Sequence, residues 1–324
     1  MKEIKIGLLG LGNIGVGTYK TLEMNRAIIE KDLGTKINIT KILEKDIDRE
    51  RDITVSKNQF VSNLEAITED PDIDIVIELL GGIEPAGTFM EKALLAGKHV
   101  VTANKAAVAA NWDRLHEAAA KSGAMFKFEA SVGGGIPVLT ALTGALKANE
   151  FEEVMGIVNG TTNYILYKMT AEGLDYESVL KDAQDKGFAE ADPTADVEGI
   201  DAANKLSILM ALMFEKYVAP DDIPTTGISR ITAADIEAAR AEGCVIKLIA
   251  HAEKLADGTV EYAVKPMNIE LSHPLAGVNA EFNAVFVKGN AVGELMFYGP
   301  GAGPLPTGSA VMGDVMEISK VILR

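Results

Sequence analysis

Apolar and polar positions alternate along the first 130 residues in two different rhythms. Short apolar runs that fit buried strands occupy residues 4–9, 37–43, 73–80, 99–102 and 124–128. Between these runs, apolar side chains recur at the spacing of an amphipathic helix over residues 14–30, 85–96 and 111–121. Strands that alternate with helices predict an α/β fold with a Rossmann-type, doubly wound parallel sheet.

The pattern changes after the glycine-rich segment 133–137. Helices are predicted over residues 138–148, 162–172, 176–186, 198–214 and 231–242. Extended segments are predicted over residues 152–158, 244–253, 259–269, 282–288 and 292–298. This order predicts an α+β domain with a mixed or antiparallel sheet. A last helix, over residues 304–322, follows a Gly-Pro loop.

The composition excludes several classes of partner. A formal net charge of −16 argues against binding to nucleic acid or to an anionic membrane, because both need basic surface. No apolar run reaches the ~20 residues of a membrane span. The N-terminus fits a strand rather than a signal peptide. The single cysteine, Cys244, lies in an apolar run, so we expect a core residue in a protein of the reducing cytoplasm.

A glycine-rich turn joins the first strand to the first helix. Its residues are Gly10, Leu11, Gly12, Asn13, Ile14 and Gly15. In this context the first glycine permits a tight turn, the second lets backbone N–H groups approach a pyrophosphate, and the third allows close packing of helix and strand. The helix N-terminus adds partial positive charge. The turn therefore predicts a dinucleotide cofactor.

The end of the second strand leaves the choice between NAD and NADP open. Glu44 would accept hydrogen bonds from the ribose hydroxyls of NAD, whereas Lys45 would favour the 2′-phosphate of NADP. Two later strand ends are expected at the same edge of the sheet and face the nicotinamide. They carry Leu80 and Gly81, and Thr102, Asn104 and Lys105.

Asp201 and Lys205 lie four residues apart and so share one face of a predicted helix. On an arbitrary helix such a pair is more often a solvated ion pair. Here residues 206–214 are almost wholly apolar, so we expect a buried helix and a pair with a function. Gly160 and Thr161 open another helix and could present N–H groups to a substrate carboxylate.

Taken in order, these segments closely resemble the homoserine dehydrogenases over nearly the whole chain. The matching blocks are residues 7–15, 102–106, 129–137, 156–166, 190–205 and 298–310. The resemblance implies NAD(P)-dependent interconversion of L-homoserine and L-aspartate 4-semialdehyde in threonine, methionine and isoleucine biosynthesis. It also implies a nucleotide-binding domain of residues 1–130 completed by 300–324. Residues 131–299 would form a substrate-binding and dimerisation domain of a homodimer. We expect a short form without the C-terminal ACT-type regulatory domain of longer members.

The resemblance also implies roles for single residues. Lys205 would be the proton donor and acceptor, and Asp201 would orient either Lys205 or the substrate hydroxyl. Lys105 would lie near the substrate and nicotinamide. Glu190 would bind the amino end of the substrate, and Asp196 would be a polar group of the pocket. The closing loop with Gly301 and Gly303 would contribute to the cofactor site.

A structural Na⁺ ion is implied in the same way. Its ligands would be the carboxylate of Glu129 and the backbone carbonyls of Val132, Gly134 and Ile136; oxygen ligands suit a hard cation. The alternative to a Na⁺ site is a glycine-rich turn that binds no metal.

Two other functions are compatible with parts of the sequence. The first is another Rossmann-type amino-acid or semialdehyde oxidoreductase. Aspartate-semialdehyde dehydrogenases need a nucleophilic cysteine, and Cys244 lies in an apolar run, which disfavours them. The second is a sensor that binds nucleotide without catalysis, and the presence of Lys105, Glu190, Asp201 and Lys205 argues against it.

Overall fold

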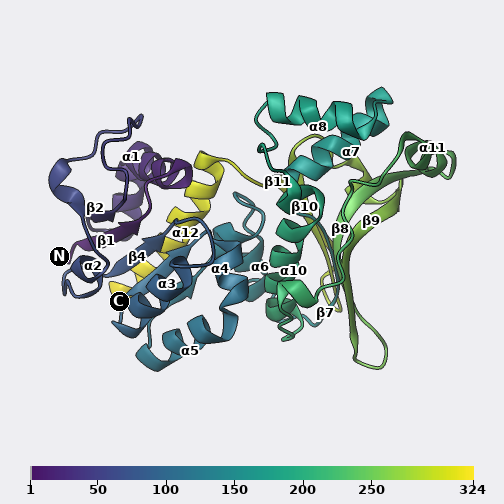
Figure 1. The fold of residues 1–324 in the computed structure, drawn as a ribbon. Coiled ribbons are helices and arrows are strands. Elements are labelled where there is room, and N and C mark those ends of the chain that lie inside the picture. The colour runs from purple at the N-terminus through teal and green to yellow at the C-terminus, as the bar shows by residue number, and fades with distance from the viewer. Residues whose placement is uncertain (1) are drawn as a thin grey trace. The chain divides into compact units, whose positions relative to one another are not determined.

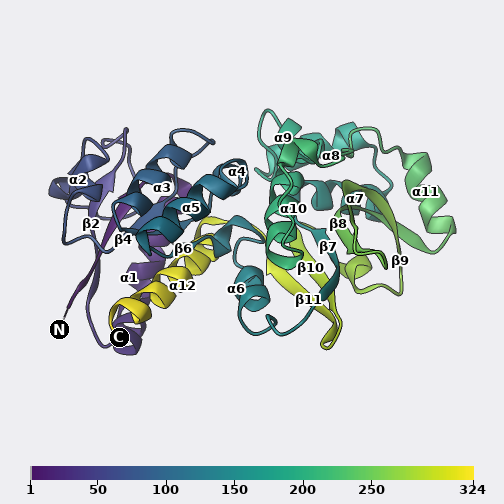
Figure 2. The same cartoon turned by 90° about the horizontal axis from the view of Figure 1, so that it is seen from below.

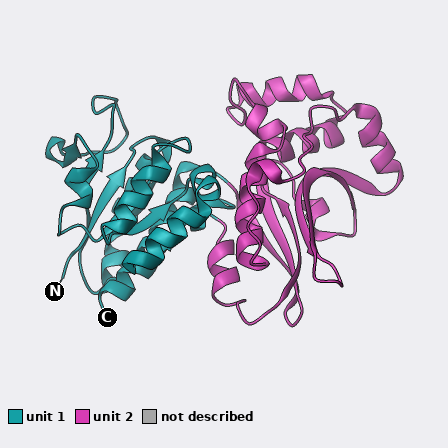
Figure 3. Ribbon diagram, turned by 60° about the horizontal axis from the view of Figure 1, so that its bottom comes forward, with its two compact units in different colours: residues 1–135, 302–324 teal, residues 136–301 magenta. Residues whose placement is uncertain are grey.

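The computed structural model describes residues 2–324, which form two units (Figure 3). The first unit contains residues 1–135 and 302–324, and the second contains residues 136–301. The C-terminal segment therefore belongs to the same unit as the N-terminal one. Each unit has its own sheet.

A six-stranded parallel sheet forms the centre of the first unit, in the order β3-β2-β1-β4-β5-β6 (Figure 1). The strands are β1 (Ile4–Leu9), β2 (Ile37–Leu43), β3 (Phe60–Val61), β4 (Ile75–Glu78), β5 (His99–Thr102) and β6 (Phe126–Lys127). The chain order reverses between β1 and β4. In doubly wound folds ligands bind beyond the carboxyl ends of the strands at such a switch point.

Helices cover both faces of this sheet because successive side chains of the strands point to opposite sides. On one face, Ile6 and Leu8 pack with α1 (Asn13–Leu33) and α12 (Pro304–Ile322). On the other face, Val76 and Val100 pack with α3 (Ala86–Leu95) and α5 (Trp112–Ser122). Two short helices, α2 (Glu65–Thr68) and α4 (Lys105–Ala110), complete the unit.

Glycines allow α1 and α12 to lie side by side (Figure 2). A Cβ atom on Gly17 would lie 2.1 Å from the carbonyl oxygen of Pro304, and one on Gly308 would lie 2.8 Å from the backbone of Gly17. No larger residue fits at either position without separating the helices. The C-terminal helix thus contributes to the apolar layer on this face together with α1.

The second unit is built on a five-stranded sheet in the order β11-β10-β7-β8-β9. Its strands are β7 (Phe151–Ile157), β8 (Cys244–Lys254), β9 (Val260–Glu270), β10 (Phe282–Gly289) and β11 (Gly293–Pro300). All these strand pairs are antiparallel, and one isolated parallel bridge joins Thr225 to Val264. Of the two expected arrangements, mixed or antiparallel, the named strands show the antiparallel one.

The helices of the second unit are α6 (Val138–Thr143), α7 (Gly160–Glu172), α8 (Tyr176–Asp185), α9 (Thr194–Val197), α10 (Ile200–Met213) and α11 (Ala233–Ala241). Of these, α7, α10 and α11 pack against β8. A separate apolar cluster includes Met155, Ile249 and Phe286 from the sheet, with a 3₁₀ turn at Pro274–Gly277 packed on it.

Three details differ from the sequence-based expectations. The helix predicted over residues 138–148 ends at Thr143, because the backbone of Gly144 (φ −112°, ψ −93°) leaves the helical region. The edge strand predicted over residues 124–128 keeps only Phe126–Lys127. Cys244 is half-buried at the start of β8 rather than in the core. Across residues 2–324, none of the helices has the length and apolarity that a membrane crossing requires.

Candidate functional site

The glycine-rich turn after β1 is shaped by two glycines and left open at a third. Gly10 has a φ of +91°, and a Cβ on it would lie 2.7 Å from the carbonyl oxygen of Leu79. A Cβ on Gly15 would lie 2.4 Å from the carbonyl oxygen of Gly10. At Gly12, the N-cap of α1, a Cβ would meet no atom within 4 Å. The fold itself needs Gly10 and Gly15, whereas the space above Gly12 is available to a ligand.

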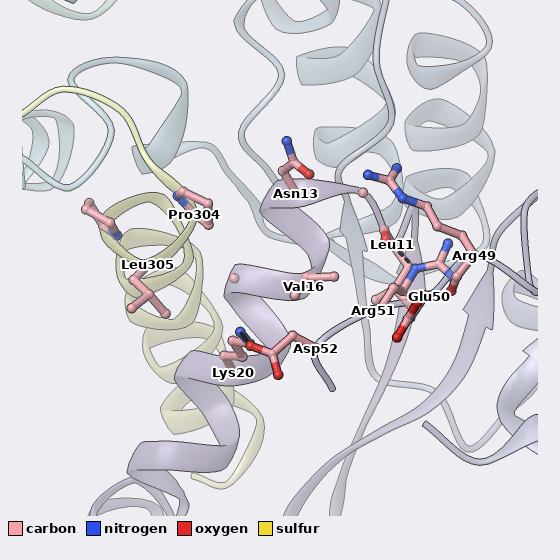
Figure 4. Close-up of a pocket in the computed structure, with 13 residues that line it drawn as sticks. Leu11, Asn13, Val16, Lys20, Arg49, Glu50, Arg51, Asp52, Pro304 and Leu305 are labelled. Atoms are coloured by element: carbon pink, nitrogen blue, oxygen red, sulfur yellow. Dashed lines mark hydrogen bonds and ion pairs between the residues drawn. The ribbon is translucent and has the colours of Figure 1, made fainter. Parts of the chain in front are cut away.

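A cavity of about 540 Å³ lies beside this turn in the first unit (Figure 4). It is lined by Leu11, Gly12, Asn13, Val16, Gly17, Lys20, Arg49, Glu50, Arg51, Asp52, Pro304, Leu305 and Pro306. The N-terminus of α1 opens on it, and basic side chains come from α1 and from the loop after β2. Backbone N–H groups, a helix N-terminus and cationic side chains are the groups that bind a dinucleotide phosphate, so the lining fits the cofactor.

Glu44 binds the backbone of the turn by hydrogen bonds and does not line the cavity. Its carboxylate accepts hydrogen bonds from the backbone N–H groups of Leu11 (2.6 Å) and Asp46 (3.0 Å). Arg51 donates to the carbonyl oxygens of Leu11 (2.9 Å) and Asp46 (2.7 Å). Burial acts to raise the pKa of Glu44, but the backbone donors and the charge of Arg51 hold it below its ordinary value.

Sequence reasoning missed the basic residues of the cavity. It weighed Glu44 against Lys45, and neither is among the described residues that line the cavity. Arg49 and Arg51 do line it. The only signal for them in the sequence is the pair of arginines six and eight residues beyond the end of β2, and a loop carries no periodicity that fixes where they point.

The carboxyl ends of β4 and β5 bring the other predicted cofactor residues together. Asn104 caps α4, since its side-chain oxygen accepts a hydrogen bond from the N–H of Ala107 (3.1 Å). Its side-chain nitrogen donates to the carbonyl oxygens of Leu80 (3.2 Å) and Gly82 (2.8 Å). Lys105 is the first residue of α4. The loop that contains Leu80 and Gly81 is therefore joined to the segment that presents Lys105.

Lys205 and Asp201 form a buried ion pair in the second unit. The Lys205 ammonium lies 2.7 Å from an Asp201 carboxylate oxygen and donates to the carbonyl oxygen of Val158 at 2.6 Å. Both residues are only 8% exposed. They are therefore not a solvated ion pair on an exposed helix. Burial of both charges is costly without such close partners, which marks the pair as a candidate for chemistry.

Asn159 links this pair to a second acidic residue, Asp196. Its side-chain nitrogen donates to Asp201 (2.9 Å) and to Asp196 (2.7 Å), and Thr161 donates to Asp196 (3.1 Å). Sequence reasoning assigned no role to Asn159. The N–H groups at the start of α7 were expected to bind the substrate carboxylate. One of them, the N–H of Thr162, instead donates to the side-chain oxygen of Asn159 (2.9 Å).

The remaining predicted residues occupy different places. Glu190 is exposed on the loop between α8 and α9, where Gln184 donates to its carbonyl oxygen (3.1 Å). Gly160 is packed, since a Cβ on it would lie 2.7 Å from the carbonyl oxygen of Glu281. Gly303 is the N-cap of α12, next to the prolines of the cavity, and Gly301 is the last residue of the second unit.

Two buried carboxyl groups lie at the segment predicted to bind a cation, residues 129–136. Glu129 is 6% exposed and Asp314 is 3% exposed, and the N–H of Glu129 donates to Asp314 at 2.9 Å. Burial, with a contribution from the charge of Glu129, raises the pKa of Asp314 to about 7. Val132 and the positive-φ residue Gly134 follow in the same unit, whereas Ile136 begins the second unit. A cation near these carboxylates would offset their repulsion.

Comparison with known proteins gives one consistent family. The family model "Homoserine dehydrogenase, NAD binding domain" matches residues 10–129, and the model "Homoserine dehydrogenase" matches residues 137–316. A homoserine dehydrogenase of Bacillus subtilis (strain 168) is 45% identical over 321 residues, which are 99% of this chain and 74% of the relative.

Solved structures agree with this result. The crystal structure of a homoserine dehydrogenase from Thiobacillus denitrificans superposes with a TM-score of 0.95 at 42% identity and covers 99% of this chain and 74% of its own. A homoserine dehydrogenase from S. aureus superposes with a TM-score of 0.86 at 41% identity, covering 98% and 76%.

Proposed function

Since the chain belongs to the homoserine dehydrogenase family and is an NAD(P)-dependent oxidoreductase, we propose that its proton transfer is performed by Lys205. The observation that carries this proposal is the buried ammonium of Lys205, held 2.7 Å from Asp201 and 2.6 Å from the carbonyl oxygen of Val158. The reaction interconverts L-homoserine and L-aspartate 4-semialdehyde. A bound nicotinamide supplies the hydride chemistry.

The residues of the chain manage the proton and the charges of the substrate. In the oxidation direction the neutral amine of Lys205 takes the proton of the homoserine hydroxyl; in reduction its ammonium returns a proton to the aldehyde oxygen. Asp201 and Val158 fix the direction of Nζ, and Asn159 in turn holds Asp201. We assign Lys105, the first residue of α4, to the same reaction as a second cationic group.

Homoserine also carries an ammonium and a carboxylate. We propose that Glu190 and Asp196 receive the ammonium, and that the start of α7, at Gly160 and Thr161, lies near the carboxylate. Asp196 is already held by Asn159 and Thr161. The assay that tests the function follows absorbance of reduced nicotinamide with purified protein, L-homoserine and either NAD⁺ or NADP⁺. A nucleotide sensor would bind the cofactor without consuming it, and that outcome would refute the proposal.

We infer that the basic residues of the cavity select the cofactor, and that NADP is accepted. Arg49 is exposed at the cavity wall, and Glu44 is engaged by the backbone of the turn. Replacing Arg49 with alanine is expected to raise KM for NADP⁺ about tenfold, since a charge-assisted hydrogen bond to the 2′-phosphate contributes roughly 1.5–3 kcal/mol. KM for NAD⁺, which lacks that phosphate, should change less than about twofold. Initial rates with both cofactors measure the two constants.

Arg230, an exposed arginine of the second unit, is the matched control. Arg230→Ala should leave both constants unchanged. The variant Lys45→Ala separates the two candidate cations: a loss of NADP⁺ preference in Lys45→Ala, with none in Arg49→Ala, would transfer the role to Lys45.

We propose that Na⁺ binds at Glu129 with backbone carbonyl groups of Val132 and Gly134. Support comes from the two buried carboxyl groups of Glu129 and Asp314. We expect the melting temperature to be roughly 3 °C higher in NaCl than in choline chloride at equal ionic strength, because a ligand of the folded state stabilises it by mass action. Glu129→Gln should abolish this increase, and the control Glu270→Gln should keep it. An equal response in Glu129→Gln would contradict the site.

We also propose that the protein is a cytoplasmic homodimer of threonine, methionine and isoleucine biosynthesis. One face of the second sheet supports the dimer: Met296 and Tyr298 are 40% and 52% exposed, opposite Phe286 and Ala284 in the register of β10 and β11. Side chains of this kind are enriched at subunit interfaces. Light scattering during gel filtration measures the mass directly.

A further inference from the structure

Glu78, the last residue of β4, is a fully buried acid that the mechanism above does not use. Its exposed fraction is 0%. One carboxylate oxygen accepts a hydrogen bond from the N–H of Leu80 (2.6 Å), and the other accepts one from the hydroxyl of Thr102 (2.6 Å). An isolated carboxylate in the interior of a sheet would cost several kcal/mol, so these bonds are needed to keep it there.

The hydrogen bonds continue from Glu78 to the start of α4. The Thr102 hydroxyl, which donates to Glu78, accepts from the N–H of Asn104 at 2.9 Å. The side chain of Asn104 donates to the carbonyl oxygens of Leu80 and Gly82. The carboxylate is thus the common acceptor of the loop after β4 and of the segment that leads into Lys105.

The donors around Glu78 match the ionised form. A carboxylate only accepts hydrogen bonds, and its partners here, the N–H of Leu80 and the hydroxyl of Thr102, both donate. Burial raises the pKa of Glu78 to about 7, although the polar groups around it, Thr102, Leu80 and Asn104, act in the opposite direction. An amide at this position would turn an N–H₂ group toward at least one donor.

We propose that Glu78 is a positioning residue of the reaction. It holds the loop Leu80–Gly82 and the segment Asn104–Lys105 in a fixed position relative to each other. The inference rests on the proposed function and on the expectation that these two strand ends face the nicotinamide. Glu78 itself touches neither; it acts through Thr102 and Asn104. The alternative is an acid that contributes only to the stability of the sheet.

Three variants separate these readings. Glu78→Gln replaces one acceptor oxygen with an NH₂ donor, Thr102→Val removes the hydroxyl at nearly constant shape, and Thr102→Ser keeps the hydroxyl. We expect kcat for homoserine oxidation to fall about 10²-fold in Glu78→Gln and Thr102→Val, the scale of a misplaced reacting group. KM for homoserine should change less than about threefold, because substrate binding in the ground state is retained. Thr102→Ser should keep kcat within about threefold of the wild type.

The double variant Glu78→Gln/Thr102→Val should lose no more than either single variant, as residues of one network are not additive. Ser319→Ala removes a hydroxyl that is also fully buried in the first unit, where it donates to Val315, and should leave kcat unchanged. A folded Glu78→Gln with wild-type kcat would overturn the inference. Equal kcat values in Thr102→Val and Thr102→Ser would also overturn the inference. This comparison tests the inference even if Glu78→Gln does not fold. A wild-type protein without turnover would instead refute the proposed function.

Discussion

Replacing Lys205 with methionine is expected to lower kcat for homoserine oxidation by about 10³-fold, within the range that general acid–base groups contribute. Methionine keeps the length and apolar stem of the side chain but carries no transferable proton. The ammonium it removes lies 2.7 Å from Asp201 in a site where both residues are 8% exposed. Initial rates at saturating homoserine and NADP⁺ measure the effect, and cofactor affinity should stay within about twofold.

The variant leaves Asp201 without its cation, and a buried charge that loses its partner destabilises a protein by roughly 3–5 kcal/mol. Folding must therefore be checked by thermal unfolding before rates are compared. The hydrogen bond from Asn159 to Asp201 remains and limits the cost. Lys254→Met, at the exposed end of β8, is the matched control and should keep full activity. A folded Lys205→Met within tenfold of the wild-type kcat would end the assignment.

Gly12→Ala is expected to raise the dissociation constant for NADPH at least tenfold, or about 1.4 kcal/mol, with the melting temperature unchanged. The backbone of Gly12 (φ −74°) accepts alanine, and the new methyl group meets no protein atom within 4 Å. Its methyl group instead fills the space above the turn that the pyrophosphate is expected to occupy. Fluorescence titration with NADPH gives the affinity.

Two other glycines control this experiment. Gly313 of α12 also has open space around a new Cβ, so Gly313→Ala should change neither stability nor affinity by a large factor. Gly10→Ala should instead destabilise the fold by roughly 1–3 kcal/mol, since its φ is +91° and the carbonyl oxygen of Leu79 lies 2.7 Å from the new Cβ. Unchanged NADPH affinity in Gly12→Ala would contradict the binding mode.

Local pattern was sufficient for most of the fold. The strands at Ile4–Leu9, Ile37–Leu43 and His99–Thr102 and the helix at residues 304–322 have the expected bounds, because each is a continuous apolar or amphipathic run. The helix after Pro137 was wrong in length, since Gly144 ends it early. Nothing in the composition of residues 145–148 opposes a helix, so the backbone of one glycine decided the outcome.

Side-chain direction in loops was beyond the reach of the sequence. Adjacent Glu44 and Lys45 pointed to the end of β2, but the structure turns Glu44 toward the backbone of Leu11 and lines the cavity with Arg49 and Arg51. The pairing of Asp201 with Lys205 was predictable, because helical spacing fixes it. The bonds from Asn159 to Asp201 and Asp196 were not, since they join segments 42 and 37 residues apart.

The side-by-side packing of α1 and α12 has a consequence for synthesis of the chain. The apolar layer on that face of the first sheet includes Val311, Val315 and Ile318 of α12, which leave the ribosome after the whole of the second unit. Translation of residues 136–301 takes roughly 10 to 30 s at 5–20 residues per second. Throughout that time Ile6, Leu8 and Leu22 lack their α12 partners, and the nascent chain presents an unfinished apolar surface to chaperones. The second unit, which is continuous in sequence, is the first that can complete its fold.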